Sequence, residues 1–286
     1  MPSLDVVIVN WNTRQQLLSG LEALAQPAPG SPVGTVVVVD NASTDGSAQD
    51  VRARHASLQV IANSTNVGYG AAVNQGMAAT TSRFVWVANA DVVSSPDTLA
   101  ALADFLEAHP TVALVAPRLR HADGTVQLSW GREPHLGTEF LQRWWWRRLE
   151  AEPGQPKLAR HTVTARRVDW VLGAAFLIRR AAFDALKGFD PSYFMYFEEV
   201  DFCSRARRAG WEIWYVPTAD AIHAGRASTG QIPHDMAVAY RRSQLKYYRQ
   251  FHGPIAAGLL GWYLKAKLSK TQEGRAVLHA LAEQPA

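Results

Sequence analysis

The sequence has little cysteine and no long apolar run. Cys203 is the one cysteine in 286 residues, which excludes an internal disulfide and a cysteine-based zinc site and favours a reducing location. No apolar stretch approaches the ~20 residues that span a bilayer. Asp5 interrupts the first apolar run, and no basic segment precedes it, so we expect no signal peptide. These absences predict a cytoplasmic protein.

Charge is also modest. Lys and Arg number 29 against 25 Asp and Glu, giving a net charge of +4. This balance suits an anionic ligand or an anionic membrane surface. No run of basic residues interleaves with a nucleic-acid motif, so we expect no nucleic-acid partner. No Walker lysine and no Gly-x-Gly-x-x-Gly fingerprint follows the first apolar run, which disfavours kinases and dinucleotide enzymes.

Short apolar runs alternate with helical patterns through the first 117 residues. This alternation predicts βαβ units and a parallel sheet. The predicted strands cover residues 4–9, 35–39, 58–62, 84–88 and 112–116. From 118 to 167 the pattern loosens, and we expect a variable, partly mobile insertion that contains Trp144-Trp145-Trp146 between arginines.

The later chain returns to regular patterns. We expect an apolar segment at 168–179, a helix at 198–208, a strand at 211–216 and a loop at 223–230. Helical patterns follow at 236–251 and 254–268.

Polar residues follow several of the predicted strands. Asn89 and Asp91 come directly after Phe-Val-Trp-Val-Ala, and side chains two apart in an extended segment share a side. Ligands of open α/β sheets bind at the carboxyl ends of strands, and oxygen ligands there suit Mg²⁺ or Mn²⁺. A polar turn is the alternative.

Other candidates invite two interpretations each. Asp40 follows four valines and can bind a nucleotide base or form an Asx-turn. Asn66 and Gly68 can approach a ribose or phosphate, or form a glycine turn. Glu198, Glu199 and Asp201 can supply a general base, or they can offset a helix dipole opposite Arg205, Arg207 and Arg208. His223 is either a metal ligand or structural.

Together these residues resemble the family-2 inverting glycosyltransferases, closest to the bacterial rhamnosyltransferase-like branch. The resemblance spans about residues 4–251 and depends on the order of its blocks. The blocks are Val6–Asn12, Val38–Ser47, Asn66–Asn74, Asn89–Asp91, Trp170–Ala174, Gly188–Asp190 and Phe194–Asp201, with His223 and Ser228.

The resemblance implies a GT-A fold, in which a Rossmann-like, mostly parallel central sheet is flanked by helices. It predicts a glycosyltransferase domain at 1–232, with a nucleotide-sugar half at 1–117 and an acceptor half at 118–232. A C-terminal helical extension is expected at 233–286.

The resemblance also assigns roles to residues. Glu199 matches the catalytic base. Beside it, we expect Asp201 to act as a helper that orients an acceptor hydroxyl, or to cap the helix. Asp91, with His223, would hold Mn²⁺ or Mg²⁺. The donor site would include Val9, Asn10, Asn12, Asp40, Asn66, Gly68, Asn74, Asn89 and Asp91, and the acceptor site Trp170, Gly173, Ala174 and Glu198. In this chain Asn89 replaces the first Asp of Asp-x-Asp, and Glu199 stands where Asp is usual.

The function that follows is metal-dependent sugar transfer with inversion. The donor would be a nucleoside-diphosphate sugar such as dTDP-rhamnose or a UDP-sugar, and the acceptor a glycan or polyprenyl-linked hydroxyl in cell-surface polysaccharide synthesis. The competing interpretations are a sugar nucleotidyltransferase and a decayed sugar- or membrane-binding module. Peripheral membrane contact through Trp144–Trp146 and through Leu259, Leu260, Trp262 and Leu264 competes with a homodimer interface or a packed C-terminal helix.

Overall fold

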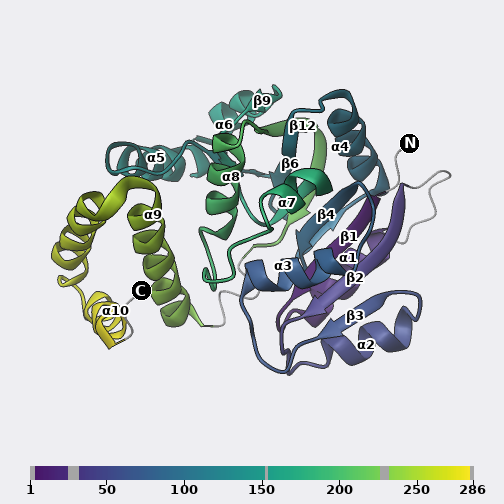
Figure 1. Cartoon of the computed structure of the whole chain (residues 1–286), viewed down its shortest axis with the longest axis horizontal. Coiled ribbons are helices and arrows are strands. Elements are labelled where there is room, and N and C mark those ends of the chain that lie inside the picture. The colour runs from purple at the N-terminus through teal and green to yellow at the C-terminus, as the bar shows by residue number, and fades with distance from the viewer. Residues whose placement is uncertain (1–3, 25–31, 152–153, 226–231, 284–286) are drawn as a thin grey trace.

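A mixed β-sheet lies between two layers of helices, with a helical lobe to one side (Figure 1). The computed structural model describes residues 4–24, 32–151, 154–225 and 232–283, without the side chains of 138–140, 142, 143, 147 and 150. Ser228 and the side chains of Arg143 and Arg147 are therefore outside the described part.

The main sheet has the strand order β3-β2-β1-β4-β11-β6-β12-β5. Its strands are β1 (Leu4–Asn10), β2 (Val33–Asp40), β3 (Gln59–Ala62), β4 (Phe84–Asn89), β5 (Val92–Ser94), β6 (Val112–Arg120), β11 (Ala175–Arg179) and β12 (Glu212–His223). The pairs β1–β2, β1–β4, β2–β3 and β6–β12 are parallel, whereas β11 is antiparallel to β4 and β6. The mostly parallel sheet predicted from the sequence is confirmed.

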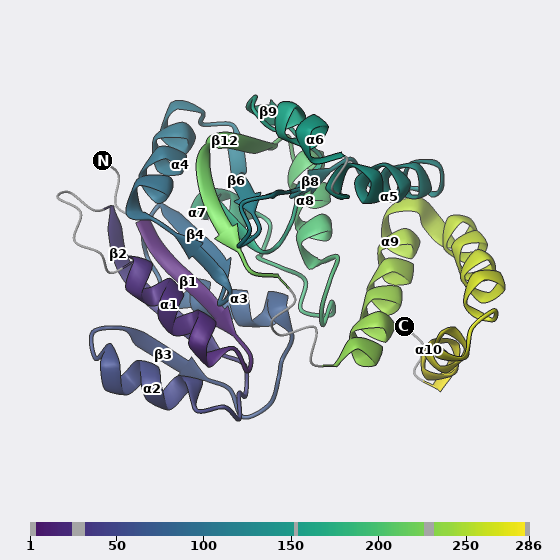
Figure 2. The ribbon, with the colours of Figure 1, turned by 180° about the vertical axis from the view of Figure 1, so that it is seen from behind.

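Helices cover both faces of this sheet, which explains why its central strands are apolar almost throughout. One face packs against α1 (Arg14–Leu24), α2 (Ser47–Arg54) and α4 (Pro96–Ala108) (Figure 2). The other packs against α3 (Tyr69–Ala78), α7 (Arg180–Ala185) and α8 (Glu198–Arg208). All residues of β1 are buried, including Asp5, which accepts hydrogen bonds from the backbone N–H groups of Thr35, Thr81 and Ser82.

The segment 118–167, expected to be a variable, partly mobile insertion without a clear pattern, contains regular elements over much of its length. This segment contains α5 (Leu136–Glu150) and α6 (Gln155–His161), with the short strands β7 (Val126–Gln127), β8 (Trp130–Gly131) and β9 (Arg166–Arg167). Strand β10 (Trp170–Val171) pairs with β8. The aromatic and basic residues of α5 hid its helical period, because they are not confined to one face.

The C-terminal helical extension is confirmed and forms the side lobe with α5 (Figure 1). It consists of α9 (Pro233–Leu268) and α10 (Gln272–Glu283). Helix α9 bends at Gly253, which has φ 83° and precedes Pro254, a residue that removes one helical hydrogen bond. The inner side of the lobe is a buried apolar cluster that includes Tyr247, Tyr248, Leu260 and Leu264. No helix within the described residues is long and apolar enough to cross a membrane.

Candidate active site

A cavity of about 380 Å³ opens at the carboxyl ends of β1 and β4, beside the N-terminus of α8. Such a position is typical of ligand sites in α/β sheets, and the volume suits a small ligand. Nine of the predicted site residues line this cavity. They are Val9, Asn66, Asn89, Asp91, Gly173, Ala174, Glu198, Glu199 and His223.

Asp91 and His223 are 132 positions apart in the sequence and adjacent in space. Strand β12 continues to His223, past the predicted end at residue 216, and pairs antiparallel with β5, so that His223 lies opposite Val92. This pairing brings His223 Nε2 to 3.4 Å from Asp91 Oδ1, with both side chains buried. His223 is therefore part of a strand and not of the predicted loop at 223–230, of which residues 226–230 lie outside the described part of the chain.

Gln127 fixes the orientation of the His223 ring. Its Oε1 lies 2.8 Å from His223 Nδ1. In the neutral ring an amide oxygen in that place accepts the Nδ1 proton, so the lone pair of Nε2 is directed at Asp91. Two electron-pair donors held this close repel each other unless a metal cation or a proton lies between them.

The donor set fits a divalent cation that a substrate helps to bind. Within the described residues no three His, Cys, Asp or Glu side chains converge as a complete metal site. One carboxylate and one imidazole suit Mn²⁺, and Mg²⁺ sites commonly combine one or two carboxylates with substrate phosphates. Asp91 and His223 are the residues that would hold the ion.

Glu199 and Glu198 lie in the first turn of α8 and are almost fully buried. The Oε2 atom of each has no hydrogen-bond partner among the described residues. Burial raises the pKa of Glu199 to about 7, although nearby backbone N–H groups, including that of Gly173, favour its ionised form. Burial, and then the charge of Glu199, raise the pKa of Glu198 well above its usual range.

These two environments separate the roles of the carboxyl groups. Burial raises the pKa of both carboxyl groups, and more backbone N–H groups favour the ionised form of Glu199 than that of Glu198. A pKa near the working pH is the property of an efficient general base. Glu199 therefore has the burial, the unpartnered oxygen and the pKa of a base.

The backbone before α8 is strained where it positions these acids. Tyr196 and Phe197 both have left-handed φ angles, 66° and 65°. Residues without glycine's freedom adopt this conformation when their surroundings enforce it, often at functional sites. Ser243 of α9 enforces it in part, because its hydroxyl donates to the Met195 carbonyl at 2.8 Å.

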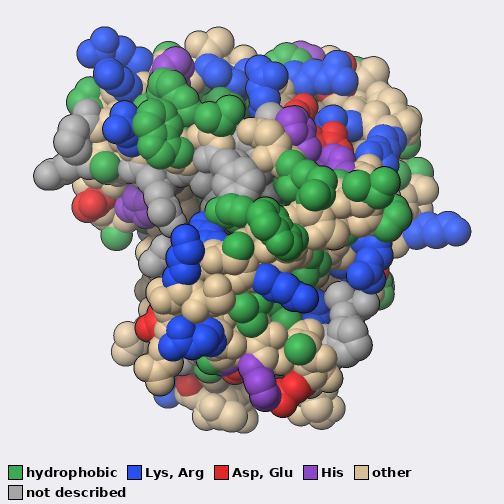
Figure 3. All heavy atoms as spheres, turned by 90° about the vertical axis from the view of Figure 1, so that its left-hand side faces the viewer, with side chains coloured by type: hydrophobic (Ala, Val, Ile, Leu, Met, Phe, Trp, Pro, Cys, Tyr) green, Lys and Arg blue, Asp and Glu red, His purple; other side chains and the backbone are tan. Residues whose placement is uncertain are grey.

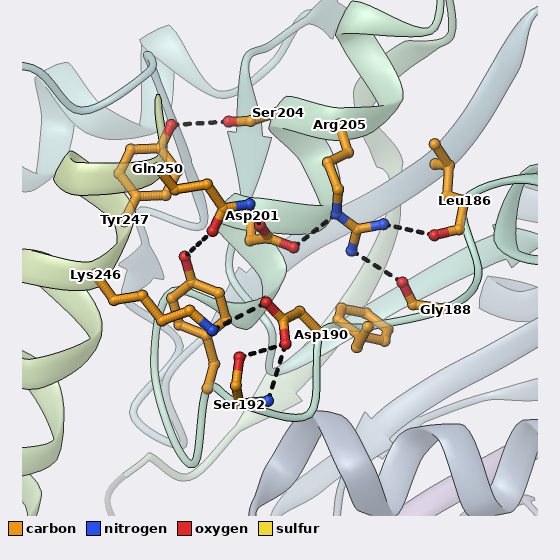
Figure 4. A network of polar contacts seen from close by, with 12 residues as sticks. Leu186, Gly188, Asp190, Ser192, Asp201, Ser204, Arg205, Lys246, Tyr247 and Gln250 are labelled. Atoms are coloured by element: carbon orange, nitrogen blue, oxygen red, sulfur yellow. Dashed lines mark hydrogen bonds and ion pairs between the residues drawn. The ribbon is translucent and has the colours of Figure 1, made fainter. Parts of the chain in front are cut away.

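Asp201 does not line the cavity and lies in a polar network between α8 and α9 (Figure 4). It is fully buried, pairs with Arg205 Nε at 2.8 Å and accepts a hydrogen bond from Gln250 at 3.0 Å. Arg205 also donates to the carbonyls of Leu186 and Gly188. Asp201 therefore has the contacts of a structural residue, whereas its two neighbours have those of site residues.

Three residues assigned to the donor form a framework behind the cavity wall. Asn10 is fully buried and donates to Asp40 Oδ1 at 2.8 Å, while Asp40 Oδ2 accepts the Ser43 N–H at 3.0 Å. Asn12 accepts the Thr44 N–H at 2.8 Å. These contacts hold the 40–44 turn against β1 and correspond to the Asx-turn alternative for Asp40.

The remaining predicted residues mainly hold loops in place. Gly68 has φ 87°, and a Cβ there would lie 2.4 Å from the Phe194 carbonyl oxygen, so backbone contact requires the glycine. Asn74 exchanges two hydrogen bonds with the backbone of Phe189. Trp170 donates to the Arg132 carbonyl and packs beside Trp146. None of these three lines the cavity.

Several lining residues had no assigned role in the sequence analysis. The cavity also contacts Trp11, Asn41, Tyr69, Gln127, Leu172, Met195, Tyr196 and Gly225. Asn41 and Tyr69 lie inside the blocks that carry the resemblance, so position in a block was an available signal. Asn41 binds Asn66 and the Val67 N–H, and the Tyr69 hydroxyl donates to the Gly173 carbonyl at 2.5 Å. Gln127 lies in the segment expected to be irregular and had no such signal.

Solved structures with this arrangement are GT-A glycosyltransferases. The mannosyltransferase PcManGT from Pyrobaculum calidifontis, in complex with GDP-Man and Mn²⁺, aligns with a TM-score of 0.59 at 18% identity, covering 100% of this chain and 76% of its own. TarS 1-349 from S. aureus, in complex with UDP, aligns with a TM-score of 0.56 at 19% identity, covering 86% of this chain and 65% of its own. The predicted GT-A fold is confirmed.

The chain belongs to the glycosyltransferase-like family 2, whose family model matches residues 2–253. It is 32% identical to the N-acetylglucosaminyl-diphospho-decaprenol L-rhamnosyltransferase of Mycobacterium tuberculosis, over 93% of this chain and 90% of that protein. A shorter match, 46% identical over 56 residues, is to rhamnosyltransferase WbbL of Escherichia coli, covering 20% of this chain and 21% of that protein. The chain is therefore a glycosyltransferase of the rhamnosyltransferase-like branch, and not a nucleotidyltransferase.

Proposed function

We propose that this enzyme transfers a sugar, with inversion, from a nucleoside-diphosphate sugar to a hydroxyl of a polyprenyl-diphosphate-linked sugar. The observation that carries the proposal is the shared cavity, in which the unpartnered carboxyl of Glu199 and the Asp91–His223 pair occur together. The acceptor class is supported by the mycobacterial relative, whose name specifies a lipid-diphosphate sugar. The first donor to test is dTDP-rhamnose, with UDP-sugars as the alternative.

The chain's own groups suffice for the proton transfer. Glu199 accepts the proton of the acceptor hydroxyl as that oxygen attacks the anomeric carbon from the face opposite the leaving diphosphate. One displacement inverts the configuration without a covalent sugar–enzyme intermediate. A divalent cation held by Asp91 and His223 would neutralise charge on the departing diphosphate.

Nucleoside diphosphate release across a donor panel tests this function. The panel contains dTDP-rhamnose, UDP-glucose, UDP-galactose and GDP-mannose, each with a prenyl-diphospho-sugar acceptor, with Mn²⁺ or with a chelator. We expect acceptor-dependent release from one donor that the chelator abolishes. No release from any donor would favour the decayed sugar- or membrane-binding module.

We further assign the donor to residues 1–117, the acceptor to 118–232 and a lipid-side extension to 233–286. The division is supported by Asp91 at the β4–β5 turn, Glu199 on α8 and the start of α9 at Pro233.

Gln127→Leu should weaken Mn²⁺ binding in the presence of nucleoside diphosphate by about 10- to 100-fold, the usual effect of losing a partner that orients a histidine ligand. Gln127→Glu keeps an acceptor for the Nδ1 proton and should restore most of the affinity. Calorimetry measures both, with Gln15→Leu on the exposed side of α1 as the matched control. Equal affinity in Gln127→Leu and the parent would show that Gln127 does not position His223.

An exposed apolar surface suggests where the lipid side lies. Trp144 and Trp145 of α5 are 50% and 54% exposed, and Ile255 and Trp262 of α9 are 81% and 72% exposed. On this side of the molecule, hydrophobic side chains lie among those of Lys and Arg (Figure 3). Leu260 and Leu264 were expected here but are buried, in a cluster with Tyr247 and Tyr248 from the first half of α9. Exposed aromatic residues among cations suit a membrane interface.

The enzyme should float with vesicles of anionic lipid at low salt and detach at high salt. Replacing both Ile255 and Trp262 by Ser should lower the bound fraction about tenfold or more, because burial of one large apolar side chain is worth about 2 kcal/mol. Replacing the exposed Val163 of the same chain by Ser is the matched control. A protein that stays at the bottom of the gradient, or that instead dimerises through this surface, would contradict the membrane proposal.

A further inference from the structure

A second cavity, larger than the one at the proposed active site, does not contain the proposed catalytic residues. It has a volume of about 620 Å³ and lies between α9, α10 and the segment before α8. Its apolar lining includes Phe194, Ile232, Met236, Val238 and Ala280. Helix α9 also contributes basic side chains to it, those of His234, Arg242 and Lys246. An apolar wall beside cations suits an anionic amphiphile.

Arg242 differs from the other basic residues of this cavity in its hydrogen bonding. Its Nε atom is buried and has no hydrogen-bond partner among the described residues. Burying part of a guanidinium without a partner costs free energy, because the group loses its hydration and gains no anion in exchange. Lys246, by contrast, is already paired with Asp190 at 2.9 Å and lies over the ring of Tyr193 (Figure 4). Arg242 lines the cavity and no ion pair engages it among the described residues, so its guanidinium is the cation with which a bound anion can pair.

The acidic residues that line the cavity do not satisfy this arginine. Asp235 and Glu283 also contact the cavity, and both residues are exposed. No ion pair joins either of them to Arg242 within the described part of the chain. Their exposure leaves them solvated, while the arginine Nε is shielded from water.

One short segment separates this cavity from the active site. Phe194 lines the larger cavity, and the next two residues, Met195 and Tyr196, line the smaller one. The segment is fixed on both sides, because the Phe194 carbonyl accepts the Tyr69 N–H at 2.9 Å and the Met195 carbonyl accepts the hydroxyl of Ser243 at 2.8 Å. A ligand in the larger cavity is thus adjacent to the wall of the catalytic cavity.

From these contacts we infer that the cavity between α9 and α10 binds the diphosphate and first prenyl units of the acceptor, with Arg242 as the diphosphate ligand. This inference rests on the proposed acceptor class and extends it to a subsite. The guanidinium offers planar, charge-assisted hydrogen bonds to phosphate oxygens. The apolar wall would contact the prenyl chain, and the acceptor sugar would extend past residues 194–196 towards Glu199.

Calorimetry with farnesyl diphosphate, without donor and in EDTA, tests the subsite directly. We expect binding to the full-length enzyme that Arg242→Gln weakens by roughly 10- to 100-fold, as the loss of a charge-assisted contact predicts. Arg241→Gln is the matched control, since Arg241 already donates to Gln244 at 2.7 Å and does not line the cavity. Inorganic pyrophosphate and farnesol should each bind more weakly than farnesyl diphosphate.

Steady-state kinetics separate this inference from the proposed function. Arg242→Gln should raise the KM for a prenyl-diphospho-sugar by a similar factor and leave the KM for the donor and the turnover number unchanged. Farnesyl diphosphate binding that depends on Arg242, in a protein that transfers no sugar, would refute the proposed function and support the subsite. Equal farnesyl diphosphate affinity in Arg242→Gln and the parent would overturn the subsite, whatever the transfer activity. Pyrophosphate binding as tightly as farnesyl diphosphate would overturn its lipid part.

Discussion

Glu199→Gln should lower the rate of sugar transfer by roughly 10²–10⁴-fold, the range typical of a lost general base. The glutamine keeps the size of the side chain but cannot accept the acceptor proton. Donor and Mn²⁺ affinity should remain near those of the parent, because Asp91 and His223 are unchanged. Single-turnover transfer and calorimetry of nucleoside diphosphate measure the two effects separately.

The pH profile provides an independent check on Glu199. Because its pKa is raised to about 7, kcat/KM of the parent should fall about tenfold per pH unit below that value, as the base becomes protonated. The linked effect on stability has the opposite direction. A pKa raised on folding stabilises the protein at low pH, and this contribution is lost as pH rises through about 7. Glu199→Gln should therefore be at least as stable as the parent at pH 8.

Neighbouring carboxyl groups serve as matched controls. Glu198→Gln should retain more transfer activity than Glu199→Gln, because fewer backbone N–H groups favour the ionised, proton-accepting form of Glu198. Asp201→Asn should chiefly lower thermal stability, since it loses the pair with Arg205, and Glu199→Asp should keep partial activity. Parent-like transfer by Glu199→Gln, with loss in Glu198→Gln or Asp201→Asn, would move the base by one or two positions.

Asp91→Ala should abolish Mn²⁺-dependent donor binding, because it removes the one carboxylate of the two-residue donor set. His223 alone cannot hold the ion at ordinary concentrations, and Asn89 contributes no charge. We expect an affinity for nucleoside diphosphate that no longer responds to Mn²⁺, and at least a 10²-fold loss of transfer.

Asp104→Ala on the exposed side of α4 is the control for a nonspecific loss of charge. The Asp91→Ala protein should stay folded, since Asp91 makes its described side-chain contact with His223 rather than with the core. Metal-dependent affinity equal to the parent's in this variant would refute the assignment of the metal site.

The parallel half of the sheet could be predicted because each of its strands is marked by its own run of apolar residues. Residues 4–10 and 84–88 are buried on both faces, and such strands consist of nearly continuous apolar runs. The polar residues at their ends, among them Asn89 and Asp91, then indicated which edge binds ligand. Glu199 was chosen from the resemblance, and its burial and unpartnered oxygen now support that choice.

What the sequence could not predict depends on long-range pairing. The contact between Asp91 and His223 requires β12 to extend past its predicted end and pair with the three residues of β5. Gln127 reaches His223 from a two-residue strand in a segment with no clear period. Arg242 differs from the other basic residues of α9 only in the folded structure, where its Nε is buried without a hydrogen-bond partner among the described residues. No pattern in the sequence of this polar-basic helix predicts that difference. Conversely, Asn10, Asp40 and Asp201 have polar side chains that the fold uses for its own hydrogen bonds.

Mass and anomeric configuration of the transfer product test the central claim most directly. The parent enzyme, Mn²⁺, dTDP-rhamnose and N-acetylglucosaminyl-diphospho-prenol should give an acceptor heavier by one deoxyhexose. Nuclear magnetic resonance of that product should show an anomeric configuration opposite to the donor's, and Glu199→Gln should form almost none. A product that retains the donor's configuration, or an unmodified acceptor across the whole donor panel, would contradict the account.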